Sequence, residues 1–408
     1  MLFIGLVYLV WFLSTYFIIL VLLLLYSGIT LFENKPYTNK KPPLVSVIIP
    51  AYNEEESIAS TISSLKNVTY TNTEFIILSD GSCDSTGQLV TANIKNDSRF
   101  KFIDNKFNKG KAACLNQGIS VARGEFIACM DADSTIEPGI IQKVLPYFEK
   151  NIGAVTVSVK VKKPTTFLDK IIDVEYLLGL SLFLKLFSKF DAIFVTPGPF
   201  SMYRHDMLEK IGGFDPTNIV EDHEIAYRIK QAGYSIRNCL EAVVETKLPP
   251  TFKGLYVQRR RWYSGAVVTL FQHRKMCFKR KYGFFSFFVP LNQVLILLGL
   301  SVFLYSTYLG LSNLIDNIMY FRYVDFDIIA RFKDFSIDLL TLNKTWFFGI
   351  STLAGTLTLT AVGLNVTRIP YNTKKTGILG YFFMFFLYQL FWIGAYISVI
   401  RGKRVKWR

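Results

Sequence analysis

The first 32 residues of the chain contain no charged side chain. A helix of about 20 apolar residues crosses the hydrocarbon core of a bilayer, and this run is longer. A cleaved signal peptide would show a basic start, a shorter apolar core and a cleavage site of small residues, and the run shows none of these. We therefore expect a retained N-terminal transmembrane helix within residues 1–32.

Three further uncharged runs lie near the other end of the chain, at Phe284–Ile315, Thr345–Thr367 and Thr376–Ile400. They predict about three membrane helices within residues 283–408. Basic residues follow the first apolar run at Lys35, Lys40 and Lys41, and five more lie between Arg274 and Lys281. Because basic residues favour the cytoplasmic side, we expect the intervening region to be cytoplasmic in an integral protein of the plasma membrane.

The basic tail from Arg401 to Arg408 does not fit this simple topology. Four full crossings would place it outside, against the charge rule. Three alternatives remain open: the last run is re-entrant or interfacial, a further crossing lies in residues 316–344, or the rule fails here.

The formal net charge of +15 narrows the choice of partners. A basic surplus suits nucleic acid, an anionic membrane surface or a phosphorylated substrate. Much of the surplus lies beside the apolar runs, which favours membrane lipids. The sequence has neither zinc-finger spacing nor an RNP-type aromatic motif, so we do not expect a nucleic-acid partner.

The region between the apolar runs alternates strand and helix patterns. Buried-strand patterns occur at Leu44–Ala51, Glu74–Ser79, Phe100–Asp104 and Glu125–Met130, and helical patterns at Glu54–Lys66 and Lys109–Arg123. This alternation predicts an α/β domain with a mostly parallel sheet over residues 43–250. Ligands of such sheets bind beyond the carboxyl ends of the strands, and the polar motifs of this chain follow those ends.

The first of these motifs is Asp131-Ala132-Asp133, which directly follows a predicted strand. Two carboxylates on one side of an extended segment can share a divalent cation and the phosphates that it neutralises. Such a pair also occurs by chance on solvated loops. The position at a strand end favours the metal site, with Asp131 and Asp133 as its ligands.

Two further motifs, Pro50–Glu54 and Asp80–Ser82, follow the first two predicted strands. Tyr52 could stack on a base, and Asp80 could accept a hydrogen bond from a base or ribose. The alternative is a pair of turns with a helix cap at Asn53.

Lys111 opens a predicted helix, where an anion such as a diphosphate is favoured; the alternative is a solvated lysine. Glu221-Asp222 also begins a helical pattern, so Asp222 is either a general base or a helix cap.

Gln258-Arg259-Arg260-Arg261-Trp262 lies on a predicted amphipathic interface helix in residues 251–282. Arginine can clamp a diphosphate, and tryptophan offers a face for a sugar ring. The residues alone slightly favour the alternative of an interfacial membrane anchor.

Taken together, these motifs resemble the family 2 glycosyltransferases, especially processive membrane synthases such as those of poly-N-acetylglucosamine, hyaluronan and cellulose. The resemblance covers about Leu44–Gly265 and rests on the order of the motifs: Pro50–Glu54, Asp80–Ser82, Gly110-Lys111, Asp131–Asp133, Glu221-Asp222, and Gln258 with Arg261-Trp262. It implies a GT-A fold, which is a Rossmann-like α/β domain, and an inverting transfer of a hexose.

The resemblance also implies roles for individual residues. Donor binding would involve Pro50, Tyr52, Glu54, Asp80, Lys111, Asp131, Ala132, Asp133, Gln258 and Arg261, with Mg²⁺ or Mn²⁺ on Asp131 and Asp133. Asp222, beside Glu221, would take the proton of the acceptor hydroxyl. Trp262 would contact the acceptor sugar, and Gly198 and Pro199 correspond in position to the floor of the acceptor site.

The expected function is therefore polymerisation of sugar from a UDP-sugar donor at the cytosolic membrane face, with translocation of the product as a hypothesis. A single-addition transferase acting on a lipid, of the ceramide or polyprenyl-phosphate type, is the alternative. The acceptor is thus a polysaccharide or a lipid, and an accessory membrane subunit is counted among the candidate partners. A catalytically idle scaffold is disfavoured, because it would not need these carboxylates.

Overall fold

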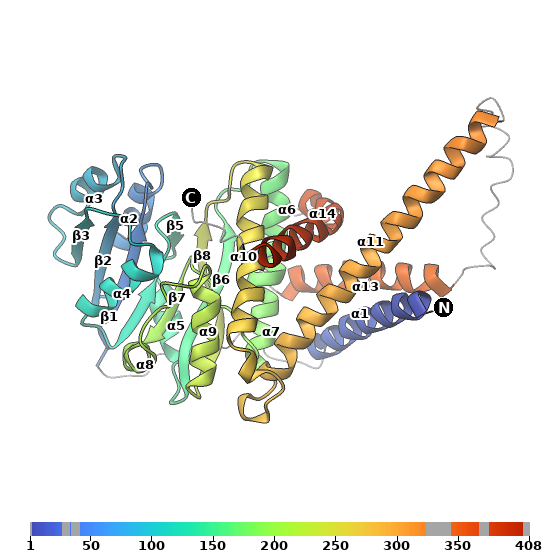
Figure 1. Ribbon diagram of the computed structural model, residues 1–408. Helices are drawn as coiled ribbons and strands as arrows, with labels where there is room; N and C mark the ends of the chain where they lie inside the picture. Colours follow the sequence, from blue (N-terminus) through green and yellow to red (C-terminus); the bar gives the residue numbers. More distant parts are fainter. Residues whose placement is uncertain (1, 27–32, 34–40, 324–343, 367–374, 403–408) are drawn as a thin grey trace. The chain divides into compact units, whose positions relative to one another are not determined.

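The computed structural model describes residues 2–26, 33, 41–323, 344–366 and 375–402 (Figure 1). The chain divides into two compact units. The larger comprises Thr30–Pro290 and Thr367–Arg408, and the smaller comprises Met1–Ile29 and Leu291–Val366.

The larger unit is built on one eight-stranded sheet with the order β3-β2-β1-β4-β7-β6-β8-β5 (Figure 1). Strands β3, β2, β1 and β4 are parallel, whereas β7 is antiparallel to both β4 and β6, and β5 is antiparallel to β8. The expected mostly parallel sheet is therefore mixed. The strands are β1 (Val45–Ala51), β2 (Thr73–Asp80), β3 (Phe100–Asn105), β4 (Phe126–Cys129), β5 (Ser134–Ile136), β6 (Ile152–Val161), β7 (Ser201–Arg204) and β8 (Ser235–Thr246).

Helices cover both faces of this sheet, which explains the unbroken apolar runs in its strands. Because successive side chains of a strand point to opposite faces, Val47 and Ile49 of β1 enter one core layer and Ile48 enters the other. The helices of this unit are α2 (Ile58–Lys66), α3 (Thr86–Ile94), α4 (Lys111–Val121), α5 (Ile140–Val144), α6 (Phe167–Tyr176), α7 (Leu184–Lys189), α8 (His205–Ile211), α9 (Glu221–Gln231), α10 (Phe252–Gln272) and α14 (Lys375–Ile400). A π-helical segment, Leu177–Phe183, joins α6 to α7.

The last apolar run forms α14, which packs on α6 and α10 of the same unit. Glycines allow the close approach: a Cβ at Gly377 would lie 2.3 Å from the Lys170 carbonyl oxygen, and one at Gly394 would lie 2.4 Å from the Tyr256 hydroxyl. Phe391 of α14 is buried in the core of the unit. This packing favours the interfacial alternative for the last run.

The smaller unit contains α1 (Leu2–Tyr26), most of α11 (Phe285–Tyr323) and α13 (Lys344–Val366). By length and composition, the described residues hold two helices able to cross a membrane, at Gly5–Leu23 and Phe285–Asp316. The apolar segments Leu353–Asn365 and Phe386–Ile400 are shorter, so the number of crossings stays a prediction. Several basic residues used for the topology lie outside the described residues: Lys35, Lys40, Lys403, Arg404, Lys406 and Arg408.

Candidate active site

The loops after β1 and β2 are joined by hydrogen bonds. The Asn53 backbone N–H donates to Ser82 Oγ (3.1 Å), and the Cys83 N–H donates to Asn53 Oδ1 (2.9 Å). Asn53 holds a left-handed backbone with φ of 53°, which asparagine tolerates well. Because α2 begins only at Ile58, Asn53 serves this loop pair rather than a helix cap. The motifs Pro50–Glu54 and Asp80–Ser82 therefore meet at one edge of the sheet, as predicted.

Asp80 organises the segment that leads into α4. It is buried, and its two carboxylate oxygens accept from the backbone N–H groups of Lys109 (2.8 Å) and Gly110 (2.9 Å). Position 81 requires glycine, because its φ is +70° and a Cβ there would lie 2.6 Å from the Asn108 backbone nitrogen. This turn determines where α4, and with it Lys111, begins.

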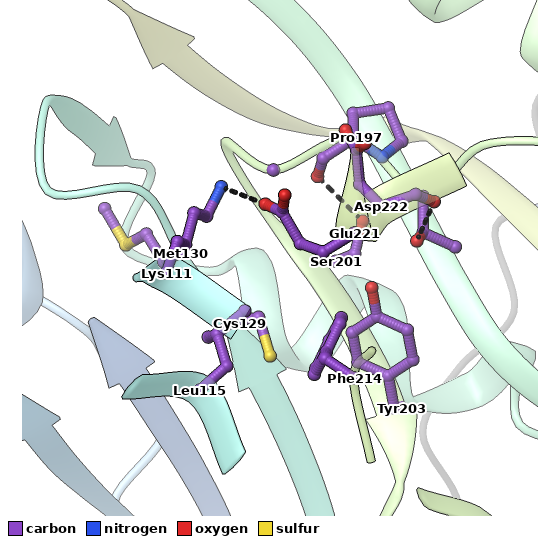
Figure 2. Close-up of a pocket in the computed structure, with 12 residues that line it drawn as sticks. Lys111, Leu115, Cys129, Met130, Pro197, Ser201, Tyr203, Phe214, Glu221 and Asp222 are labelled. Atoms are coloured by element: carbon purple, nitrogen blue, oxygen red, sulfur yellow. Dashed lines mark hydrogen bonds and ion pairs between the residues drawn. The ribbon is translucent and has the colours of Figure 1, made fainter. Parts of the chain in front are cut away.

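Lys111 bridges two carboxylates inside the pocket. Its ammonium lies 2.6 Å from Asp131 and 2.9 Å from Glu221, and Figure 2 shows it pointing toward Glu221. Burial lowers the pKa of Lys111, but Asp131, Glu221 and Asp222 together raise it well above its ordinary value. Lys111 is thus a charged group of the site, and the alternative of a solvated lysine is wrong.

The segment Thr196–Gly198 lines one side of the pocket. Thr196 donates from its N–H and its hydroxyl to the Asp222 carbonyl oxygen, both at 3.0 Å. The Asp131 N–H donates to the Gly198 carbonyl oxygen at 3.2 Å, and a Cβ on Gly198 would lie 2.8 Å from both Asp131 Oδ2 and Lys111 Nζ. Because Gly198 has no side chain, the Lys111–Asp131 ion pair can occupy this position.

Asp222 lies in the first turn of α9, after Val220 and Glu221. Within the part of the chain that the structure describes, its buried Oδ1 has no hydrogen-bond partner. Burial and the neighbouring Glu221 carboxylate raise the pKa of Asp222 to about 7. Burial also raises the pKa of Glu221, but the Lys111 and Arg261 cations lower it below its ordinary value. Asp222 therefore titrates near neutral pH, whereas Glu221 stays ionised there. Helix α9 has no side-chain cap hydrogen bond, so a cap role for Asp222 is not supported.

The surroundings of Asp133 disfavour its negative charge and would favour a bound cation. Burial and repulsion by Asp131 and Glu54 raise its pKa to about 7. Its Oδ1 accepts from the hydroxyls of Ser134 (3.1 Å) and Thr246 (3.3 Å). Carboxylate oxygens are the ligands that Mg²⁺ and Mn²⁺ prefer, and a divalent ion would offset the repulsion. The described residues contain no group of three or more His, Cys, Asp or Glu side chains suited to a metal, so any ion would depend on further ligands.

Helix α10 is held against the segment that carries Asp222. A Cβ on Gly265 would lie 1.8 Å from Val220 Cγ2, so the helix backbone touches the residue before Glu221. Arg261 is near enough to lower the pKa of both Glu221 and Asp222. Gln258 has a buried Oε1 that lacks a hydrogen-bond partner among the described residues. The helix is therefore a packed part of the site, and a role as membrane anchor alone is not supported.

Sequence reasoning missed Arg259, which is fully buried. Its guanidinium pairs with Glu175 of α6 and lies 4.2 Å from the centre of the Trp262 ring. Three consecutive arginines on a helix point in directions about 100° apart, so they cannot share one role. The sequence therefore indicates that the three arginines have different roles, but it does not identify Glu175 as the partner of Arg259.

The pocket brings together some of the predicted residues and leaves others outside. Its lining includes Lys111, Gly198, Glu221 and Asp222, besides Met130, which leads into Asp131. As far as the structure describes the chain, the lining does not include Tyr52, Pro199, Gln258 or Trp262. The Ala132 carbonyl oxygen accepts from Thr61 Oγ1 (2.7 Å) and so fixes α2 below the metal motif. The donor roles of Tyr52, Ala132 and Gln258 and the acceptor roles of Pro199 and Trp262 stay predictions.

Residues 46–212 match the family model described as glycosyl transferase family 2. This span includes four of the six motifs on which the resemblance rests: Pro50–Glu54, Asp80–Ser82, Gly110-Lys111 and Asp131–Asp133. The chain carries a family 2 glycosyltransferase domain. The predicted family resemblance is thus confirmed for this domain.

Two curated relatives that match the glycosyltransferase domain share one name. Poly-beta-1,6-N-acetyl-D-glucosamine synthase of Staphylococcus epidermidis is 32% identical over 223 residues, which cover 54% of this chain and 54% of that protein. The synthase of the same name from Staphylococcus aureus is 30% identical over 236 residues, 56% of this chain and 57% of that protein. The chain spans about half the length of these relatives.

A solved structure matches nearly the whole chain. The mannosyltransferase PcManGT from Pyrobaculum calidifontis, in complex with GDP-Man and Mn²⁺, aligns with a TM-score of 0.62 over 98% of this chain and all of that one. At 18% identity this likeness shows the fold alone. The glycosyltransferase domain is accordingly a GT-A-like α/β domain, as expected, with a mixed rather than mostly parallel sheet.

Proposed function

We propose that this chain is a membrane-associated, inverting glycosyltransferase that polymerises a sugar from a UDP-sugar donor. The names of the relatives make UDP-N-acetylglucosamine the first donor to test and favour a polysaccharide over a lipid acceptor. The observation that carries the proposal is Asp222, whose buried Oδ1 has no hydrogen-bond partner within the described residues and which lines the same pocket as the cationic Lys111.

The chemistry that follows is one displacement at the anomeric carbon. The acceptor hydroxyl oxygen forms the new bond to that carbon while the bond to the donor diphosphate breaks, and its electron pair leaves with the diphosphate. The hydroxyl proton passes to the Asp222 carboxylate, whose pKa of about 7 suits a general base at neutral pH. Attack opposite the leaving group converts an α-linked donor into a β-linked product.

Cations of the chain would stabilise the departing diphosphate. Lys111 lies in the pocket between Asp131 and Glu221, and the Arg261 cation acts on Glu221 and Asp222. Asp131 and Asp133 would hold Mg²⁺ or Mn²⁺, which supplies further charge compensation on the phosphates when bound. Gln258 and Trp262, carried by α10, would close the site over the acceptor sugar, as the family resemblance implies.

The proposal is tested by incubating the purified protein, in nanodiscs, with radiolabelled UDP-sugars and Mg²⁺ or Mn²⁺. High-molecular-weight product from UDP-N-acetylglucosamine, lost in Asp222→Asn, is the expected result. The matched control is Asp206→Asn, because Asp206 is an exposed residue in the first turn of α8. A single lipid-extractable product would replace the polymerase by the lipid-acceptor alternative. Full transfer by Asp222→Asn would overturn the assigned base.

A further inference from the structure

The segment joining α10 to α11, residues 271–287, is strongly basic and is called the basic loop here. It has no acidic residue, and it contains five basic ones. All five are exposed: Arg274, Lys275, Lys279, Arg280 and Lys281. Two short 3₁₀ turns, Arg274–Met276 and Arg280–Tyr282, shape the segment.

Phenylalanine rings stand exposed among these charges. Phe271 and Phe278 are each 61% exposed, and Phe284 is 52% exposed. Phe278 also holds a left-handed backbone with φ of 58°, which is strained for a bulky side chain. Its N–H donates to the Ser286 carbonyl oxygen (2.9 Å), and Ser286 Oγ donates to the Lys279 carbonyl oxygen (2.8 Å). The loop is thus a closed, hydrogen-bonded turn that keeps an apolar ring in solvent at a conformational cost.

We propose that the basic loop docks on a membrane surface of anionic phospholipid and thereby sets the position of the catalytic helix α9. Lysine and arginine beside exposed aromatic rings suit a headgroup layer, where charges meet phosphates and rings enter the acyl boundary. The loop continues directly into the apolar helix at Phe285–Asp316, which has the length and composition of a membrane span. That continuity favours lipid over another polyanion.

The loop is attached to α9 by specific contacts. The Tyr227 ring packs edge-on against Phe285 at 5.0 Å, and these two side chains form a small core with Met276. His273 Nε2 lies 3.0 Å from Glu224 Oε1, two residues after Asp222. Glu224 is 1% exposed and is also held by Arg228.

Further along, the loop before α9 is tied to the end of α10. Asn218 Nδ2 donates to Thr269 Oγ1 (3.2 Å) and to Gln272 Oε1 (2.9 Å). Through these contacts, we expect a displacement of the basic loop to move α9, whose first turn carries Glu221 and Asp222. This step rests on the proposed function, whereas the docking itself does not.

The test uses the full chain in nanodiscs of phosphatidylcholine with or without phosphatidylglycerol. The membrane helices stay embedded in both, so only the headgroup charge changes. Two readouts are taken: hydrogen–deuterium exchange of residues 271–287, and turnover of the UDP-sugar. We expect phosphatidylglycerol to slow exchange in the loop and to raise turnover about threefold or more, and 0.5 M NaCl to weaken both effects.

Two variants of the loop and one control isolate the cause. The triple substitution Lys279→Gln, Arg280→Gln and Lys281→Gln should abolish the response to phosphatidylglycerol. Phe278→Asn should also weaken this response, and asparagine tolerates the left-handed backbone at this position better than phenylalanine does. The control removes three exposed lysines elsewhere in the larger unit, Lys66, Lys95 and Lys101, and should respond like the unaltered chain.

The outcomes separate the two proposals. Equal exchange in both lipids, or equal responses of the triple variant and its control, would overturn the docking. Slower exchange with unchanged turnover would refute the coupling to α9. Slower exchange with no turnover of any UDP-sugar would support the docking and count against the proposed function instead.

Discussion

The Arg259 guanidinium lies 2.9 Å from the Glu175 carboxylate, which also accepts a hydrogen bond from the Tyr388 hydroxyl. These residues come from α10, α6 and α14, so one half-buried carboxylate ties together three helices that are far apart in sequence. The Trp262 ring packs on the same guanidinium. The orientation of Trp262 therefore depends on this cluster.

Replacing Arg259 should change acceptor recognition more than donor recognition. A desolvated cation–π contact is worth about 2 kcal/mol, so Arg259→Met should raise the KM for a short N-acetylglucosamine oligomer by about thirtyfold, with little change for the UDP-sugar. Arg259→Lys keeps the charge but loses the planar guanidinium, so its KM for the oligomer should lie between those of the unaltered chain and Arg259→Met.

The stability of the same variants gives a separate readout. Breaking a buried ion pair costs about 3 kcal/mol, because the remaining charge is left uncompensated, although the partial exposure of Glu175 reduces this. We expect Arg259→Met to lower the melting temperature in detergent, and Glu175→Gln in the same chain to restore part of it. Restored stability without restored acceptor affinity would support the positioning of Trp262. Equal recovery of both would contradict it.

The pH profile should report Asp222. Its pKa of about 7 means that the carboxyl is protonated, and unable to accept a proton, in acidic solution. We therefore expect kcat/KM to rise with pH up to about 7 and then level off. Glu221→Gln removes the repulsion that raises this pKa and should move the rising limb to lower pH, measured with saturating metal.

Asp222→Asn should lower kcat by about 100-fold or more, the range for loss of a general base. The residual rate should also lose the rising limb near pH 7. A residual rate that kept this limb would assign the titration to another group.

Lys111→Met should impair the donor site. It leaves Asp131 and Glu221 without the ammonium that lies 2.6 and 2.9 Å away. We expect a loss of about 100-fold in kcat/KM for the donor, since one stabilising group at a developing anion contributes about that much. Lys109→Met is the matched control, because Lys109 is exposed and only its backbone N–H binds Asp80. Similar losses in both variants would mean that general charge, and not the Lys111 bridge, is responsible.

Gly198→Ala should disturb the site without unfolding the chain. The new methyl group would lie 2.8 Å from Asp131 Oδ2 and Lys111 Nζ, both side-chain atoms that can shift. Displacement of catalytic groups by about 1 Å can cost 100-fold in rate, and we expect a loss of that order with a nearly unchanged melting temperature. Gly139→Ala meets open space and should behave like the unaltered chain.

Local patterns were sufficient for most of the elements around the site. The predicted strand at Leu44–Ala51 is observed at Val45–Ala51, and the helix predicted from Lys109 begins at Lys111. Helix α2 begins four residues later than expected, because the backbone around Asn53 bonds to the next loop instead. That competition involves residues about thirty positions away, and periodicity within one segment does not report it.

By itself, the sequence determined the apolar helices, the α/β domain and the acidic residues at its strand ends, because periodicity, hydropathy and strand-end position are local properties. Tertiary structure alone decided which charges meet. Lys111 reaches Glu221 across 110 residues, and Glu175 reaches Tyr388 across 213. Tertiary structure also decided that β7 is antiparallel to its neighbours and that α14 packs on α6 and α10. Such contacts depend on which surfaces are buried together, and burial is a property of the whole fold.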